Sequence, residues 1–80
     1  MSVRIQVTDK DSKVLKNVTV TVKWPGSTSK RKTNNSGIAD MECSGGTIEY
    51  IQVWDEKVCG RRVVGNDELV EVISTKYRAG

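Results

Sequence analysis

The sequence predicts an all-β fold: a seven-stranded antiparallel Greek-key sandwich that forms one domain over residues 1–80. Valine alternates with polar residues over 17–24, and the same period of two recurs over 38–43, which is typical of strands with one buried face. The Asn-Asn-Ser-Gly run at 34–37 supplies residues that accept a positive φ, as a tight turn requires. No segment shows sustained helical periodicity.

The first strand, 3–8, places three aliphatic side chains on one face. A polar turn at 9–13 follows it. The second strand, 17–24, is ended by Pro25, because proline cannot donate to the hydrogen-bond ladder. Residues 27–29 are expected to form a flexible loop.

The third strand, 30–33, is short and highly polar, and its lysines favour a place at a sheet edge, where charge discourages pairing with other chains. The fourth strand, 38–43, follows the Asn-rich turn. A turn at 44–46 separates it from the fifth strand, 47–54. Apolar residues on both faces of the fifth strand indicate a central or doubly covered position.

The sixth strand is expected at 57–64 after a turn at 55–56, and Gly60 marks a bulge within it. The seventh strand, 68–75, is rich in valine and leucine. Residues 76–80 are expected to be frayed, as chain ends usually are.

Composition restricts the classes of function. The chain has 13 basic and 10 acidic residues, a net charge of +3 and no histidine. Residues 1–22 contain charges throughout and no long apolar run, which indicates no signal peptide and no membrane insertion. A cytoplasmic location is therefore expected by default, and the oligomeric state is left open.

Three segments together resemble the prealbumin-like (Ig-like) sandwich domains, which include the carboxypeptidase regulatory-like and Cna B-type modules. They read IQVTDKDSKVLKNVTVTVKW, KTNNSGIADMEC and GGTIEYIQVW, and the resemblance covers roughly residues 3–54. The resemblance implies a non-catalytic module that acts as a spacer, a stalk or a binding accessory, often within a larger protein.

The C-terminal run 74–80 is similar to the Tyr-Arg-Gly-Ser signature of the transthyretin-like hydroxyisourate hydrolase, an enzyme of the same fold group. That enzyme depends on histidines, and this chain has none to carry general acid-base chemistry. No enzymatic activity is therefore expected.

Two groups of basic residues are candidate contacts for nucleic acid or another polyanion, if their strands share one face with a tryptophan nearby. The alternative is that these charges only keep the surface soluble. The candidate residues are Lys30, Arg31, Lys32, Arg61 and Arg62, with Trp24 or Trp54.

The two tryptophans, Trp24 and Trp54, are expected mainly to pack in the core, since the chain has few other large residues. The alternative is a place at the rim, where an exposed indole anchors a partner.

Cys43 and Cys59 are expected to be reduced and largely buried, with a cross-strand disulfide as the alternative. Asp9 and Asp11 are expected to bond their own backbone in a turn, with a calcium site as the weaker alternative. No cofactor and no metal is expected.

The function favoured by the sequence is a small non-enzymatic structural or protein-interaction module. It would recognise a partner, most simply another protein, through an edge strand or through end loops. The expected contact region is the strand at 30–33 with the loop Pro25–Ser29. Polyanion binding through the basic residues is the alternative.

Overall fold

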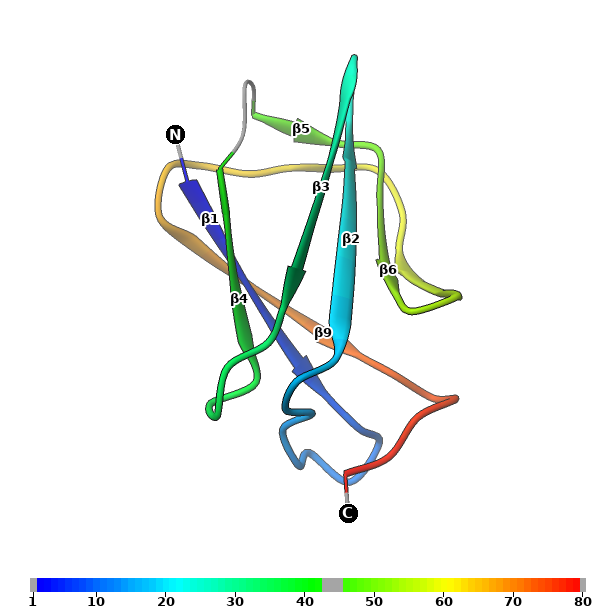
Figure 1. Cartoon of the computed structure of the whole chain (residues 1–80). Helices are drawn as coiled ribbons and strands as arrows, with labels where there is room; N and C mark the ends of the chain where they lie inside the picture. The colour runs from blue at the N-terminus through cyan, green and yellow to red at the C-terminus, as the bar shows by residue number, and fades with distance from the viewer. Residues whose placement is uncertain (1, 43–45, 80) are drawn as a thin grey trace.

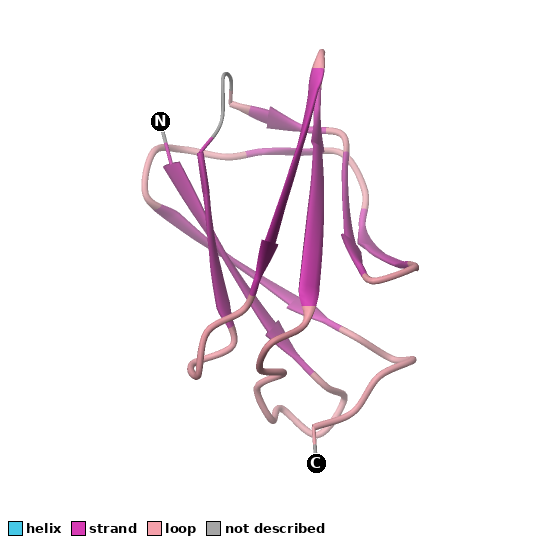
Figure 2. Cartoon of the chain, viewed as in Figure 1, coloured by secondary structure: helices cyan, strands magenta, loops and turns pink. Residues whose placement is uncertain are grey.

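The computed structural model of the chain describes residues 2–42 and 46–79, and these residues are all-β, with no helix (Figures 1 and 2). The strands form three sheets. The three-stranded sheet has the order β4 (Ile38–Glu42), β1 (Ser2–Thr8), β9 (Glu68–Ile73). The four-stranded sheet has the order β3 (Ser27–Lys32), β2 (Thr19–Trp24), β6 (Tyr50–Val53), β7 (Glu56–Cys59), and the two-stranded sheet pairs β5 (Thr47–Ile48) with β8 (Arg62–Val63).

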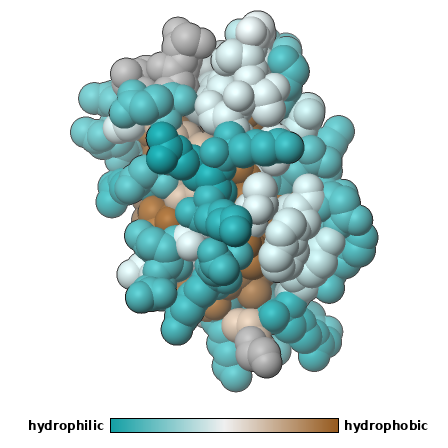
Figure 3. All heavy atoms as spheres, in the orientation of Figure 1, coloured by the Kyte–Doolittle hydropathy of each residue, from teal (hydrophilic) through white to brown (hydrophobic). Residues whose placement is uncertain are grey.

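The predicted alternations are confirmed by burial. The apolar faces of the three- and four-stranded sheets and flanking residues pack together in one core. Figure 3 shows hydrophilic residues over most of one face of the molecule, with apolar residues visible between them. The core consists of Val3, Ile5, Val7, Leu15, Val18, Val20, Val22, Trp24, Ala39, Met41, Ile48, Ile51, Val53, Val64, Val70 and Val72.

One strand pair differs from the predicted antiparallel arrangement. β1 and β9 run parallel and side by side (Figure 1), with Val3 opposite Glu68 and Thr8 opposite Ile73. The remaining strand pairs among the described residues are antiparallel. An alternating pattern shows which face of a strand is buried but not its direction, so the prediction was wrong for this pair.

The predicted fifth strand, 47–54, is divided at Glu49 into β5 and β6, which belong to different sheets. Ile48 and Ile51 are both fully buried although they are three positions apart. In one straight strand this odd spacing would put them on opposite faces, and the interruption at Glu49 turns both toward the core. β6 is central, as predicted.

The predicted sixth strand, 57–64, is likewise divided, into β7 and β8, and Gly60 lies between them. The irregularity in its pairing lies earlier, where the register shifts so that Val58 is the extra residue in β7. The division of two predicted strands accounts for the difference between seven and nine.

The predicted loop at 27–29 is the beginning of β3. Pro25 and Gly26 alone form the turn, because Trp24 and Ser27 already face each other across the hairpin. Gly26 has φ 82°, a conformation that glycine adopts without strain. The edge position predicted for this polar strand is confirmed.

The predicted turn after β3 is confirmed in detail. The side-chain Oδ1 of Asn34 accepts the amides of Ser36 and Ile38 at 2.8 and 3.1 Å, and Gly37 has φ 73°. These bonds satisfy the backbone of the turn that carries the chain from the four-stranded to the three-stranded sheet.

Candidate functional site

Trp54 lies in the two-residue turn between β6 and β7, and its backbone has φ 52°. Its side chain is 46% exposed, whereas Trp24 is fully buried and donates its Nε1–H to Ser29 Oγ at 3.2 Å. The core prediction is therefore confirmed for Trp24 and wrong for Trp54. The reason is local: Ile51 and Val53 occupy the core face of β6, so the next residue, Trp54, enters the turn on the side away from the core.

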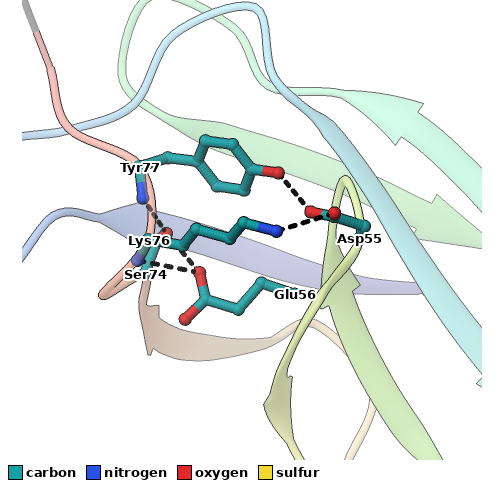
Figure 4. A network of polar contacts seen from close by, with 5 residues as sticks. All are labelled: Asp55, Glu56, Ser74, Lys76 and Tyr77. Atoms are coloured by element: carbon teal, nitrogen blue, oxygen red, sulfur yellow. Dashed lines mark hydrogen bonds and ion pairs between the residues drawn. The ribbon is translucent and has the colours of Figure 1, made fainter.

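The ring of Tyr77 packs edge to face against the indole of Trp54, with ring centroids 4.5 Å apart. The Tyr77 hydroxyl bonds to Asp55 Oδ1, and Lys76 Nζ lies 2.7 Å from Asp55 Oδ2 (Figure 4). The hydrogen bond from Lys76, followed by that from Tyr77, lowers the pKa of Asp55. The chain end thus closes over the β6–β7 turn.

The Glu56 carboxylate binds the C-terminal segment at residues 74–76. Its Oε1 accepts the Ser74 hydroxyl at 2.6 Å and the Lys76 amide at 3.2 Å (Figure 4). Its Oε2 accepts the Thr75 amide at 3.0 Å and the Thr75 hydroxyl at 2.8 Å. Burial would raise the pKa of Glu56, but the hydrogen bonds from Ser74 and Thr75 lower it to about 2.

Asp9 connects the chain end to the first turn. Its Oδ1 accepts the amides of Asp11 and Lys13, and its Oδ2 accepts the amide of Ala79 at 3.0 Å. The bond from Ala79, helped by the bond from Lys13, lowers the pKa of Asp9 although burial opposes the shift. The turn role predicted for Asp9 is confirmed, and the prediction that residues 76–80 are frayed is wrong for 76–79.

These contacts build an open groove of about 540 Å³ beside the indole, which we call the Trp54 groove. Its floor is apolar and its rim carries three cations, and none of its lining residues is acidic. The lining residues are Lys13, Val14, Leu15, Lys16, Val18, Trp54, Arg78 and Ala79. The volume lies within the ~300–1,000 Å³ that ligand sites commonly have.

The structure divides the first group of basic residues predicted as a site. Lys30 and Lys32 lie opposite Thr21 and Thr19 of β2, whereas Arg31 lies opposite the fully buried Val20. Directly opposite residues share a face of the sheet, so Arg31 points to the other side of β3 from its two neighbours. There it lines a small hollow with Ser2, Asp40, Met41 and Glu42 of the three-stranded sheet.

The second group, Arg61 and Arg62, does not lie beside the basic residues of β3. Arg61 lies beyond β7 and lines a hollow with Pro25, Thr47 and Glu49. Arg62 belongs to β8 in the two-stranded sheet and forms an ion pair with Glu68 at 2.9 Å. β3 and β7 are the two opposite edges of the four-stranded sheet, so the five residues do not form one basic patch.

Sequence reasoning missed the cations of the Trp54 groove, Lys13, Lys16 and Arg78, and the role of Tyr77. The only local signal was the placement of Lys13 and Lys16 on either side of two apolar residues. The contact between the first turn and the chain end joins residues 70 positions apart, and no local pattern reports such a contact.

The described part of the chain contains no cluster of three or more histidine, cysteine, aspartate or glutamate side chains arranged to hold a metal ion. Cys59 is half-buried and its Sγ donates to the Gly60 carbonyl at 3.4 Å, so the largely buried position predicted for it is only partly met. Cys43 lies outside the described residues, as does most of the turn predicted at 44–46. Within residues 2–42 and 46–79 no helix has the length and apolar character needed to cross a membrane.

No protein-family model matches the chain, and no curated protein matches its sequence. Among solved structures, a chain of the Bacillus anthracis TIE protein superimposes with a TM-score of 0.66 at 16% sequence identity. The match covers 90% of this chain and 16% of that chain. At this identity the likeness shows the fold alone, and this chain corresponds to a small part of that longer protein.

Proposed function

We propose that this chain is a non-enzymatic protein-interaction module with a prealbumin-like sandwich fold. In this proposal the Trp54 groove holds a short segment of a partner protein that carries a carboxylate beside an apolar side chain. The observation that carries the proposal is the position of Trp54: a bulky aromatic residue at positive φ, half exposed, beside an apolar floor ringed by three cations.

The backbone conformation of Trp54 supports a role beyond stability. A positive φ costs a side chain with a Cβ about 1–2 kcal/mol, and glycine would occupy this turn without that cost. The exposed part of the Trp54 side chain contributes no free energy of burial to folding. Backbone strain of this kind is common where a side chain is positioned for binding.

The chemistry of the groove indicates the kind of segment that fits. Leu15 and Val18 offer a buried apolar floor, and tryptophan and arginine are the residues most often found at the centres of binding surfaces. Lys13, Lys16 and Arg78 supply charge for a carboxylate. Fixed walls, held by Asp9 and Glu56, reduce the entropy that binding must overcome.

This site lies among end loops, one of the two modes expected from the sequence, but at the other end of β2 from Pro25. The Trp54 amide donates to the carbonyl of Thr19, the first residue of β2, whereas Pro25 follows the last. We therefore prefer the Trp54 groove as the contact region over the edge strand β3 and the Pro25 turn.

The test is selection from a displayed library of random peptides of about ten residues. We expect enrichment of peptides with aspartate or glutamate next to leucine, isoleucine or phenylalanine. The double variant Lys16→Glu, Arg78→Glu should weaken a selected peptide at least tenfold. The control Lys30→Glu, Lys57→Glu, which changes the net charge equally away from the groove, should change it less than twofold. Enriched peptides without acidic residues, or equal loss in both variants, would contradict the proposal.

A further inference from the structure

The register of the four-stranded sheet defines a second surface that is separate from the Trp54 groove. Val20 and Val22 of β2 face the core, so Thr19, Thr21 and Lys23 lie on the opposite side of the sheet. Thr21 is only 7% exposed on that side, so the accessible groups there belong to its neighbours. Lys32 lies opposite Thr19 and Lys30 lies opposite Thr21, and both therefore share this outward face.

The same face continues across the sheet. Thr21 lies opposite Gln52 of β6, and Gln52 lies opposite Lys57 of β7, while Lys23 lies opposite Tyr50. With strands spaced by about 4.8 Å, the backbones of Lys30 and Lys57 stand roughly 14 Å apart across the four strands. We call this surface the lysine face. Its outward residues are Thr19, Thr21, Lys23, Thr28, Lys30, Lys32, Tyr50, Gln52 and Lys57.

The lysine face carries four positive charges, and none of its outward residues is acidic. The whole chain has a net charge of +3, so everything outside this face sums to 3 − 4 = −1. The ion pairs among the described residues, Arg62–Glu68 and Lys76–Asp55, lie elsewhere. Among the described residues, the lysine face is thus one of two surfaces on which unpaired cations gather, the other being the rim of the Trp54 groove.

Tyr50 lies between the cations of this face. Lys23 is its direct cross-strand neighbour, and the Lys57 ammonium sits 4.8 Å from the centre of its ring. Lys23 Nζ donates to the carbonyl of Trp24 at 3.0 Å. Lys57 is exposed and its long side chain can swing aside, so a flat π-system could take its place over the ring.

We propose that the lysine face binds single-stranded nucleic acid, with phosphates on Lys23, Lys30, Lys32 and Lys57 and a base on the ring of Tyr50. A positive surface that tracks the backbone, with an aromatic ring for base stacking, is the arrangement that single strands require. In a duplex each base is stacked between its neighbours, whereas a single strand leaves a base free to stack on Tyr50. The site shares no residue with the Trp54 groove and does not depend on it.

The experiment is fluorescence anisotropy with a fluorescein-labelled 15-nucleotide oligothymidine. Four phosphate contacts on a single strand give a slope of about −2.8 for log affinity against log salt. Affinity should then fall about 50-fold between roughly 50 and 200 mM salt. The double variant Lys30→Gln, Lys32→Gln should reduce the slope to about −1.4, with two contacts left.

The matched control is Arg31→Gln, Arg61→Gln, which removes the same charge from positions off the face. Its slope should equal that of the wild type, and its affinity should stay within twofold. Urea unfolding of each variant shows that the fold is retained. Equal effects in the two double variants would mean that net charge alone attracts the oligonucleotide and would overturn the assignment.

Tyr50→Leu separates stacking from phosphate contact. Loss of base stacking should weaken binding at least fivefold. The salt slope should stay unchanged, because stacking releases no counterions. Absence of binding at 50 mM salt would overturn the proposal. Binding of a 15-base-pair duplex or of heparin as tight as that of the single strand would also overturn it, in favour of a general polyanion surface.

Discussion

The indole of Trp54 and the ring of Tyr77 lie edge to face, with an interplanar angle of 71° and centroids 4.5 Å apart. This pair joins a turn between two strands to a chain end that enters no strand. Asp55 and Glu56, the next residues after Trp54, bind the same segment through their carboxylates. Three consecutive residues, Trp54, Asp55 and Glu56, therefore hold the C-terminal segment that forms one wall of the Trp54 groove.

The different environments of the two tryptophans can be measured by fluorescence. The variant Trp54→Phe retains the fully buried Trp24, and its emission should be blue-shifted and resistant to acrylamide quenching. The variant Trp24→Phe retains the half-exposed indole and should emit further to the red with strong quenching. Similar quenching constants for the two variants would contradict the position of Trp54 in the turn.

The contribution of Glu56 should depend on pH. Its pKa is about 2 in the folded protein against an ordinary value of 4.5. A folded pKa below the unfolded one means stabilisation that is complete above about pH 5 and is lost as the pH falls from 4.5 through 2. Glu56→Gln removes a charged acceptor of four hydrogen bonds and should cost about 1–3 kcal/mol at pH 7.

Urea unfolding at pH 7, 5, 3.5 and 2 checks this prediction. The difference in unfolding free energy between wild type and Glu56→Gln should be constant from pH 7 to 5 and then shrink. Glu71→Gln is the control, because Glu71 is an exposed carboxylate on β9. A difference that persists unchanged at pH 2, or that also appears in the control, would contradict the role given to Glu56.

Local patterns predicted the parts of this fold in which consecutive residues obey one rule. Strand β1, strand β2 and the turn at 33–37 lie where alternation and turn chemistry place them. The interruption at Glu49 was not predicted, because Ile48 and Ile51 are compatible with a straight, doubly covered strand until the second sheet is known.

The candidate sites show a similar limit. The sequence groups Lys30, Arg31 and Lys32 because they are adjacent, but the pleat sends the middle residue to the opposite side. Only the register with β2 decides which lysines share a face with Lys57. The Trp54 groove depends on the bond between Asp9 and Ala79, and the sequence offers no pattern that reports a contact over that separation.

Thr33 should be important for stability although it lies between strands. Its hydroxyl donates to the Leu15 carbonyl at 2.6 Å and accepts the Val18 amide at 3.1 Å, and the residue is only 5% exposed. Thr33→Val keeps the shape and leaves both groups without this partner, so it should cost about 2–4 kcal/mol in urea unfolding. Thr28→Val, at an exposed position of β3, should stay within about 0.5 kcal/mol. Equal costs would show that the buried hydroxyl is not needed.

Gly37 and Gly26 provide a matched pair for the last prediction, since both have a positive φ, 73° and 82°. A Cβ on Gly37 would lie 2.7 Å from the Cβ of Val14 and 3.0 Å from the Val7 carbonyl oxygen, whereas a Cβ on Gly26 meets nothing within 4 Å. Gly26→Ala should therefore show only the backbone cost, about 1 kcal/mol.

Gly37→Ala adds a clash with a backbone atom that cannot easily move, and should cost roughly 2–4 kcal/mol. Val14 also lines the Trp54 groove, so a shift of Val14 away from the new methyl group should weaken peptide binding in Gly37→Ala and leave it unchanged in Gly26→Ala. Urea unfolding and peptide titration of the two variants measure both effects. If both substitutions cost the same, the close packing of the turn against Val14 does not contribute to stability.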